Sequence, residues 1–542
     1  MKLKKRLGIA VLLIGMLFTT VSFKSDFFEI AKQIEIFTTL FKELNMNYVD
    51  EISPATLMNK AITGMLEDLD PYTVYWNEQQ VEDAKISRSG TYTGIGANVK
   101  HDKNKIIIVE PFKDYPADKA GLKAGDEIIK IGDIHIDAFE DDAAELLKGA
   151  PGTSVEVTYK RANKTHTTTI TRGAVELKAV PFYTMADATT GYIVLSQFSA
   201  RATTETREAL INLKNEGAQK IILDLRGNPG GLLTEAIKIV NLFVPKGEVI
   251  TSTKSHIKKY NKVYRTMNEP VDKDIPLVVL INGKSASASE IVAGAIQDLD
   301  RGVVIGARSF GKGLVQRPQN LNYGTQLKVT ISRYYTPSGR CIQSVNYGEY
   351  DENGDPIRLD PTHSNAFKTR KGRTVYDGGG ISPDIELNSA IQSPITLTLI
   401  RDNIIFDFAT KYYYNNDIKK LDNFKLNDSD FNEFLKFIDQ SDFSYQTTAE
   451  KKFSEGYKIA NEELEEQDIS QAYQQLMKAI EDAKLNQIKN RKEEIKSLLT
   501  DEILKRYFYR EGLYEYQLSH NPEILEAVKV LNDQKRYQSI LN

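Results

Sequence analysis

The chain has 542 residues, which is too long for one hydrophobic core and predicts about three or four domains. Hydrophobic residues make up 41% of the chain and charged residues 27%, a balance typical of a soluble globular protein. The net charge of −4 gives no reason to expect nucleic acid as a partner.

Residues 1–25 have the form of an export signal or a short membrane anchor. Four lysines or arginines within residues 2–6 precede an apolar segment over residues 7–21. This segment is shorter than a comfortable membrane span, and no A-x-A motif follows it. We therefore expect export, with the protein either released by cleavage or anchored by residues 7–23. The sole cysteine, Cys341, cannot form an internal disulfide.

Two amphipathic helices are expected in residues 26–85. Apolar side chains recur at steps of three and four from Phe27 to Leu44, which predicts a helix with one narrow apolar stripe. Ser53 and Pro54 have the chemistry of an N-cap and a first helical residue, so a second helix is expected to begin there. Packing within one chain is the simplest explanation of such stripes.

The segment from Tyr92 to about Arg172 changes to short β-rich runs and resembles a PDZ domain. In that comparison the loop Gly94-Ile95-Gly96 would receive a peptide C-terminus. Glycines let consecutive N–H groups converge on a carboxylate, and the adjoining strand edge accepts the peptide as an extra strand. A lone Gly-x-Gly is usually only a turn, but an Ala-Gly-Leu-x-x-Gly-Asp element follows it at residues 120–126.

From Gly191 the pattern predicts strand, helix, strand and helix in succession, which is typical of an α/β domain. The expected elements are the strand at 191–195, the helix at 204–214, the strand at 221–225 and the helix at 232–242. The glycine turn Gly227–Gly231 follows the second strand, where open α/β sheets place their sites. It lacks the spacing of a phosphate-binding loop.

Residues 275–316 combine a buried strand, a serine-bearing turn, a helix and a basic loop. Ser287 falls at the predicted helix N-terminus, in the positive end of the helix dipole. Ser287 and Glu290 also fit a capping box, a structural role that needs no catalysis. Lys312 lies between two glycines, and a buried amine there could lose its charge and act as a base.

Four motifs resemble those of the carboxyl-terminal processing proteases, also called tail-specific proteases, which are Ser-Lys peptidases. They are Asp224-Leu-Arg-Gly-Asn-Pro-Gly-Gly231, Gly283-Lys-Ser-Ala-Ser-Ala-Ser-Glu-Ile291, Phe310-Gly-Lys-Gly-Leu-Val-Gln316 and Tyr335-Thr-Pro-Ser-Gly-Arg340. The spacing of 25 residues between Ser287 and Lys312 agrees with the family pattern. With the PDZ segment, the resemblance covers roughly residues 27–387.

The resemblance implies that Ser287 is the nucleophile, Lys312 the base and Gln316 its support. It also implies an oxyanion hole made by the N–H groups of Gly230 and Ala288, with Gly231 as the near alternative to Gly230. The implied activity is a serine endopeptidase that forms an acyl-enzyme and selects protein substrates by their C-terminal tails, in the bacterial periplasm or cell envelope.

No cofactor and no metal ion is expected. The implied partners are unfolded or tail-exposed proteins, a second protomer paired through the N-terminal or C-terminal helices, and an adaptor protein. The six histidines are scattered and fit neither a Ser-His nor a zinc site. The alternative is a catalytically silent PDZ-containing binding or scaffold protein, which would be expected to have lost Ser287, Lys312 or a glycine of the turn.

The expected fold is a mixed α/β multidomain architecture in which a PDZ domain is inserted between N-terminal helices and an α/β Ser-Lys protease core. Beyond about Ser389 the residues predict helices, to which the sequence assigns no chemistry. The expected divisions are a signal or anchor at 1–25, helices at 26–85, a PDZ domain at 86–175, the protease core at 176–388 and a helical C-terminal region at 389–542.

Overall fold

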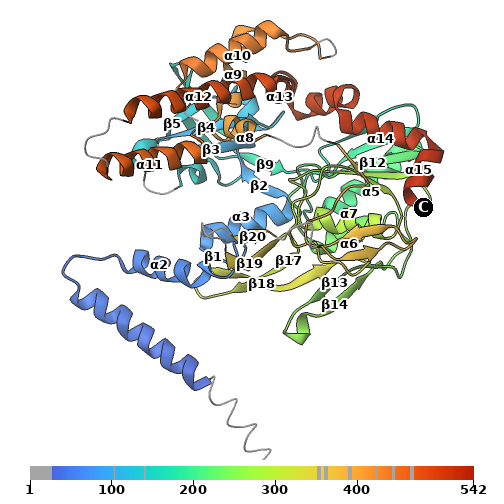
Figure 1. Ribbon diagram of the computed structural model, residues 1–542, viewed down its shortest axis with the longest axis horizontal. Helices are drawn as coiled ribbons and strands as arrows, with labels where there is room; N and C mark the ends of the chain where they lie inside the picture. Colours follow the sequence, from blue (N-terminus) through green and yellow to red (C-terminus); the bar gives the residue numbers. More distant parts are fainter. Residues whose placement is uncertain are drawn as a thin grey trace, which may run out of the picture.

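The computed structural model has the predicted mixed α/β architecture, with N-terminal helices, a PDZ domain, an α/β core and a helical C-terminal domain (Figure 1). The signal or anchor expected at residues 1–25 lies outside the described residues. No helix in the part of the chain that the structure describes is long and apolar enough to cross a membrane. The described residues are 27–102, 104–139, 142–350, 356–358, 364–387, 393–421, 424–441, 443, 446–463 and 469–542.

The N-terminal region confirms both predicted helices. The first covers residues 27–47 and extends away from the rest of the molecule in Figure 1, so that its apolar side chains are exposed. The second, α2 (Pro54–Glu67), begins as predicted, because the Ser53 side chain accepts a hydrogen bond from the N–H of Thr56 at 3.3 Å. The strand β1 (Val74–Trp76) and the helix α3 (Glu78–Ser89) follow and lead into the PDZ domain.

The PDZ domain is built on an antiparallel sheet in the order β3-β4-β5-β7-β8, with the short strand β6 paired to β5. Its two connections to the rest of the chain lie side by side, because β2 (Thr91–Gly94) pairs with β9 (Gly173–Glu176). The elements of the domain are β3 (Ala97–Asp102), β4 (Lys105–Pro111), α4 (Pro116–Lys119), β5 (Glu127–Ile131), β6 (Ile134–His135), β7 (Ser154–Arg161) and β8 (Lys164–Thr171).

The α/β core is a six-stranded sheet in the order β10-β11-β12-β15-β16-β23, parallel except for the edge strand β10. Its central strands are continuous apolar runs because both faces of the sheet are covered. The elements are β10 (Phe182–Met185), β11 (Thr190–Val194), α5 (Ala202–Asn215), β12 (Lys220–Asp224), α6 (Leu233–Val240), β15 (Leu277–Ile281), α7 (Ala288–Asp298), β16 (Val303–Gly306) and β23 (Ile385–Glu386). They confirm the predicted alternation of strands and helices.

The two faces of this sheet are covered by different parts of the chain. Alternate side chains such as Ile193 pack with α5, α6 and α7, whereas Tyr192 and its equivalents pack with the last two helices, α14 (Pro522–Asn532) and α15 (Gln534–Leu541). These two helices lie beyond the expected division at residue 388 and nevertheless pack on the sheet of the core. The end of the chain completes the protease core.

Replacing Ile524 by alanine is expected to lower the free energy of unfolding by about 2–5 kcal/mol, because this fully buried α14 side chain packs on the core sheet. Leu525, which is 37% exposed on the same helix, is the matched control and should cost much less. Denaturant unfolding of the two variants measures the difference. Equal losses would mean that α14 does not contribute to the core.

A second, antiparallel sheet contains the two long strands that follow α7, together with three strands from earlier in the chain. Its order is β1-β18-β13-β14, and β17 pairs with β18 as well. The remaining strands are β13 (Val249–Lys254), β14 (Lys262–Arg265), β17 (Leu314–Asn320) and β18 (Gln326–Tyr335). Because β1 belongs to the N-terminal region, this sheet joins the start of the chain to the segment that follows Lys312.

The C-terminal helical domain packs around its own core. The helices expected in this region are confirmed, and Ile495, Leu499 and Ile503 are fully buried in that core. The domain also binds the PDZ domain, where Arg510 contacts both carboxylate oxygens of Glu110 at 2.6–2.9 Å. Its helices are α8 (Pro394–Arg401), α9 (Ile404–Asn415), α10 (Asp428–Gln440), α11 (Thr448–Glu463), α12 (Ser470–Asn490) and α13 (Lys492–His520).

Candidate active site

Ser287 occupies a strained turn between β15 and α7. Its φ of 55° and ψ of −110° are unfavourable for a residue with a side chain, so the surrounding structure must hold it in place. Ser285 Oγ donates to the carbonyl of Leu225, just before the glycine turn, at 2.8 Å, and Ser289 Oγ donates to the carbonyl of Asn228, within the turn, at 2.9 Å. The serine turn and the glycine turn are therefore fastened together.

Glu290 lies at the centre of the site. One carboxylate oxygen accepts hydrogen bonds from the Ser287 N–H at 2.7 Å and the Lys312 N–H at 2.9 Å. The other accepts from Ser309 Oγ at 2.5 Å and the Gly311 N–H at 2.7 Å. Complete burial raises the pKa of Glu290, and these four hydrogen bonds oppose the rise.

The structural role and the proposed catalytic role of this turn are thus compatible. Glu290 binds the Ser287 N–H in the manner predicted for a capping box, and Ser287 occupies the N-cap position. The same oxygen also binds Lys312, which is 25 residues further along the chain. The buried hydroxyl of Tyr334 lies between the carbonyl oxygens of Lys312 and Ser287. The backbones of the two residues are therefore held together from both sides.

The Lys312 side chain lies in a mostly buried environment. Its amine is 4.1 Å from the centroid of the Tyr72 ring. Burial and, to a smaller extent, the positive charge of Lys328 lower the pKa of Lys312, while Glu290 and Asp70 act in the opposite direction, and the net result is a pKa of about 8. A substantial fraction of the amine is therefore neutral just above neutral pH, as a general base requires.

If the neutral Lys312 amine is the base, cleavage is expected to rise with pH through a midpoint near 8. Replacing Lys328 by glutamine removes a neighbouring positive charge, so the pKa of Lys312 and the midpoint should both move up. The pH dependence of kcat/KM for one peptide measures this. A midpoint of about 6.5 that disappears when a histidine is replaced would contradict the assignment of the base.

Sequence reasoning missed the contribution of the N-terminal region. Asp70 Oδ1 accepts hydrogen bonds from the N–H groups of Tyr72 and Thr73 at 2.9 and 3.0 Å, which closes a tight turn and places Tyr72 against Lys312. Thr330 of β18 donates to the same carboxylate oxygen at 3.1 Å. The Asp-Pro-Tyr-Thr turn at residues 70–73 was the available signal, but only the fold brings it to the lysine.

Gln316 lies on β17 beside an irregularity in its pairing with β18. Its side-chain amide donates to the Thr330 hydroxyl at 3.2 Å, and Thr330 in turn binds Asp70. Gln316 therefore belongs to the polar network that surrounds the lysine. Its expected role in orienting the Lys312 amine stays a prediction.

The glycine turn lies directly against the serine turn. A Cβ atom on Gly230 would come within 2.7 Å of the Ala286 carbonyl oxygen, and Gly230 has a φ of 101°, so the position requires glycine. Its N–H donates to Asn228 Oδ1 at 2.9 Å. The Gly230 N–H could donate a hydrogen bond to an oxyanion only after its bond to Asn228 is broken. The assignments of Gly230, its alternative Gly231, and Ala288 at the first residue of α7 stay predictions.

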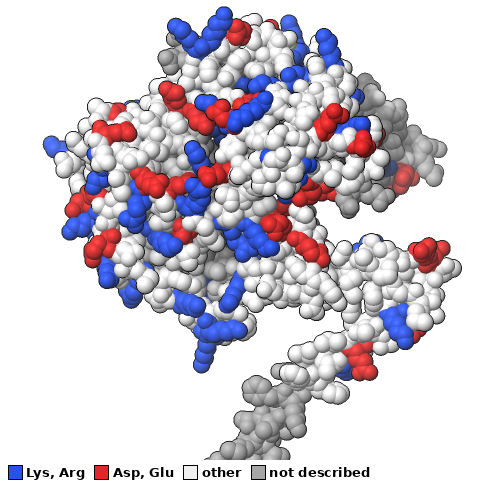
Figure 2. Space-filling model, turned by 180° about the vertical axis from the view of Figure 1, so that it is seen from behind, with Lys and Arg blue, Asp and Glu red and all other residues white. Residues whose placement is uncertain are grey.

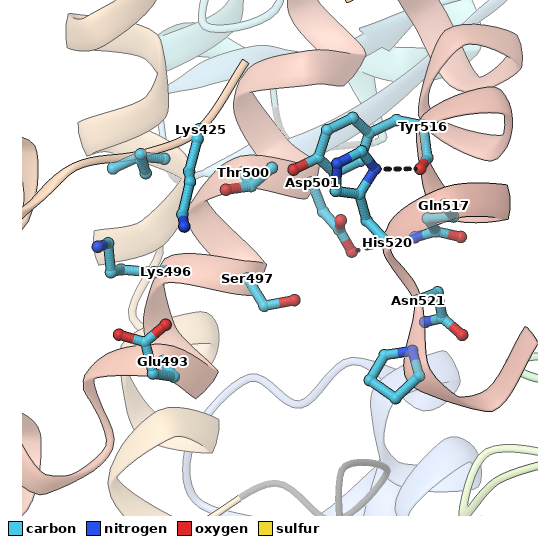
Figure 3. Close-up of a pocket in the computed structure, with 12 residues that line it drawn as sticks. Lys425, Glu493, Lys496, Ser497, Thr500, Asp501, Tyr516, Gln517, His520 and Asn521 are labelled. Atoms are coloured by element: carbon cyan, nitrogen blue, oxygen red, sulfur yellow. Dashed lines mark hydrogen bonds between the residues drawn. The ribbon is translucent and has the colours of Figure 1, made fainter. Parts of the chain in front are cut away.

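The C-terminal domain reaches the glycine turn through Arg226. This side chain donates to Asn521 Oδ1 at 2.8 Å and to Glu523 Oε2 at 2.7 Å. Asn521 also borders a polar cavity of about 230 Å³ in the helical domain (Figure 3). Burial raises the pKa of Asp501, which lines this cavity, to about 6.

The loop at residues 94–96 of the PDZ domain, which was predicted to bind a peptide C-terminus, is already hydrogen-bonded. Ile95 is buried in the domain core, and its carbonyl accepts from the Ala117 N–H at 2.7 Å. Burial raises the pKa of the Tyr92 hydroxyl, while hydrogen bonds from the N–H groups of Ala97 and Gly96 oppose the rise. Of the donors expected to receive a peptide carboxylate, the Gly96 N–H is thus directed at Tyr92, together with that of Ala97, while the roles of Gly94, Ile95 and Gly96 stay predictions. Within the described residues, no group of three His, Cys, Asp or Glu side chains could hold a metal ion.

A PDZ domain joined to an α/β core with a serine at a helix start defines the class of PDZ-containing peptidases. The chain belongs to peptidase family S41, whose model matches residues 189–348. A PDZ domain matches residues 93–171, and the probable PDZ-protease C-terminal helical domain matches residues 395–531. The N-terminal domain described for the activating protease CtpB matches residues 20–80.

The chain is similar to known proteases over more than half its length. It is 37% identical to a carboxy-terminal-processing protease of Bartonella bacilliformis over 58% of this chain and 73% of the relative. It is 32% identical to a probable CtpA-like serine protease of Staphylococcus saprophyticus over 61% of this chain and 66% of the relative. A solved photosystem II D1 C-terminal processing protease is 26% identical, with a TM-score of 0.37, covering 65% of this chain and 92% of that one. The resemblance to carboxyl-terminal processing proteases is confirmed.

Proposed function

We propose that this S41 family member is an active serine endopeptidase that uses Ser287 and Lys312 and selects protein substrates by their C-terminal tails. The observation that carries the proposal is the single buried Glu290 oxygen that binds the backbone N–H groups of both Ser287 and Lys312. It holds the backbone of a strained serine at a helix start close to that of a lysine whose pKa is lowered to about 8. The proposal requires the serine hydroxyl and the lysine amine to come within hydrogen-bond reach of each other when substrate is bound.

The mechanism is acyl transfer. Neutral Lys312 removes the proton of the Ser287 hydroxyl while Ser287 Oγ attacks the peptide carbonyl, and the amine leaving group then receives the proton. The N–H of Ala288 and an N–H of the glycine turn stabilise the oxyanion; we assign the second donor to Gly230 once it leaves Asn228, with Gly231 as the alternative. Water then hydrolyses the ester with Lys312 again acting as base. No cofactor takes part.

The alternative is a silent PDZ-containing scaffold of the same fold. Such a protein would have no reason to keep a serine in a strained conformation, or a lysine whose burial works against its own charge. Both features are present in this chain, together with the glycines at 230 and 231. They favour the peptidase.

The decisive experiment incubates the purified protein with an unfolded polypeptide and identifies the product ends by mass spectrometry. The wild type should produce fragments, and Ser287→Ala should produce none while keeping a normal melting curve. Fragments from both proteins would assign the cleavage to another nucleophile or to a contaminant. No fragments from either would favour the scaffold.

The PDZ loop is proposed to bind the free carboxylate of the substrate tail in place of the Tyr92 hydroxyl. Amidating the tail should therefore lower kcat/KM by about 10-fold, because a charge-assisted hydrogen bond is roughly twice as strong as a neutral one. Tyr92→Phe removes the competing hydroxyl and should tighten binding of the free-acid peptide. Equal cleavage of the free-acid and amidated peptides by the wild type would remove tail recognition from the proposal.

We further propose that the bound PDZ domain activates the core and does more than tether the substrate. The domain contacts α3 through Lys148 and Asp83 at 2.7 Å, and α3 directly follows β1 and the Tyr72 turn that touches Lys312. Deletion of residues 92–172 should then abolish cleavage of all peptides. Loss of tail preference with cleavage retained would favour tethering.

Two further expectations remain proposals. The exposed apolar side chains of the helix over residues 27–47 favour a homodimer formed through this helix, which light scattering on the full chain and on a variant lacking residues 27–47 would test. Export to the bacterial periplasm or cell envelope rests on residues 1–25, and fractionation of expressing cells would test it. An adaptor protein that delivers substrates stays a prediction.

A further inference from the structure

A groove follows one edge of β18, where the second sheet has a gap. The strand β17 pairs with β18 along residues 326–333 and so occupies one of its two edges. On the other edge, β1 pairs with residues 326–328 and β13 with residues 333–335. Residues 329–332 therefore have no strand neighbour on that edge, and they line a groove of about 480 Å³. The Thr330 N–H already donates to the Thr73 hydroxyl at 3.1 Å, so an extended peptide along this edge would pair with the remaining backbone groups.

The groove adjoins the catalytic segment. Leu314 lines it and pairs with Arg333, and Leu314 is only two residues beyond Lys312, or about 7 Å along a strand. Tyr334, the next residue of β18, contacts the carbonyl oxygens of Ser287 and Lys312. A substrate held at Ser287 would therefore extend into the groove within a few residues of the cleaved bond.

The wall of the groove formed by β13 and the loop after it is positively charged. Lys254 and Arg333 stand directly opposite each other in the antiparallel pairing of β13 with β18, and His256 lines the groove beside them. Like charges at opposite positions of a sheet are destabilising. The Lys254 amine lies 4.3 Å from the centroid of the Tyr335 ring, and among the described residues neither Lys254 nor Arg333 has an ion pair with a carboxylate.

The turn that connects β13 to β14 adds further positive charge at residues 258, 259 and 262, all lysines. Figure 2 shows lysine and arginine side chains gathered where this hairpin projects from the molecule. The carboxylate at the other end of the groove, Asp70, is already bound by Tyr72, Thr73 and Thr330. In a chain of net charge −4, this local excess of positive charge faces the path of the substrate.

We infer that this groove binds an acidic segment of the substrate, with an extended backbone along β18 and side-chain carboxylates directed at Lys254, Arg333 and His256. The inference rests on the proposed peptidase function and adds a rule to it: acidic residues near the cleaved bond promote cleavage. A substrate carboxylate between Lys254 and Arg333 would also relieve their mutual repulsion. Tail binding by the PDZ domain and selection by the groove are then separate steps.

The test uses three peptides that share one tail and one cleavage site. The first has glutamines in the four positions on each side of the cleaved bond, the second has glutamates on the amino side, and the third has glutamates on the carboxyl side. One glutamate peptide should be cleaved with a kcat/KM about 3–10-fold above that of the glutamine peptide at low salt, and the difference should shrink as salt is added.

The double variant Lys254→Gln with Arg333→Gln should lose this preference, so that its kcat/KM becomes equal for the glutamate and glutamine peptides. Lys478→Gln makes the same kind of charge change on an exposed position of α12 and should keep the preference. Both groove residues are exposed and stand opposite each other, so the melting temperature of the double variant should change little, because the relief of repulsion offsets the lost contact of Lys254 with the Tyr335 ring.

The outcomes separate the two proposals. Equal cleavage of all three peptides by the wild type, or an unchanged preference in the double variant, would overturn the groove inference while the peptidase function stands. Failure to cleave any peptide would overturn both. An anionic membrane is the competing occupant: if the double variant keeps the preference but loses sedimentation with phosphatidylglycerol vesicles, the positive charge serves lipid binding and the inference is wrong.

Discussion

Replacing Lys312 by alanine is expected to lower kcat/KM for peptide cleavage by about 10³-fold or more, because the chain would lose the base that activates Ser287. Ser287→Ala should have an effect of similar size. The double variant should be no worse than either single one, since a nucleophile and its base act as a unit. Single-turnover assays on one fluorogenic peptide would measure all three variants.

Lys312→Arg is the sharpest control. Arginine keeps a positive charge and similar length but stays protonated at any useful pH, so it cannot act as a base. Activity retained in this variant would contradict the role of Lys312. Ser285→Ala is the control for the turn: its buried hydroxyl binds the Leu225 carbonyl, so the variant should lose about 1 kcal/mol of stability and keep its cleavage.

Glu290→Gln is expected to lower kcat by about 100-fold with little change in KM. A glutamine side chain offers one acceptor oxygen where the carboxylate has two, so N–H groups of the serine and lysine segments would face its amide donor. We expect a loss of about 2–4 kcal/mol in the free energy of unfolding, because hydrogen bonds to a buried charge are lost. Glu290 is a positioning residue in this account, since it acts through the Ser287 and Lys312 backbones.

The pH profile of Glu290→Gln distinguishes a role in positioning Ser287 and Lys312 from a general loss of protein stability. The negative charge of Glu290 raises the pKa of Lys312, so removing it should move the midpoint of the profile to lower pH. Glu235→Gln is the matched control, because Glu235 is also a buried helical glutamate but binds Thr203 and Lys238. It should lower stability without moving the midpoint. A Glu290→Gln enzyme with normal kcat and an unchanged midpoint would remove Glu290 from the site.

Features with a local physical cause could be predicted from the sequence. Ser53 and Pro54 begin a helix because a hydroxyl can cap it and a proline needs no N–H partner there. The apolar runs at 191–195 and 277–281 became core strands because a sheet covered on both faces needs them. The position of Ser287 at a helix start and the glycine turn at 227–231 were also predicted, because small residues and glycines favour such turns from local sequence alone.

Contacts between distant segments could be known only from the tertiary structure. Periodicity and capping describe residues a few positions apart, whereas Glu290 joins Ser287 to Lys312 and the turn at 70–73 brings Tyr72 to a lysine 240 residues away. The same holds for α14 and α15, whose apolar stripes predict burial but not the sheet face that they cover. Which strands meet, and which side chains then share one carboxylate, depends on chain topology, because hydrogen bonds and packing require closeness in space and not in sequence.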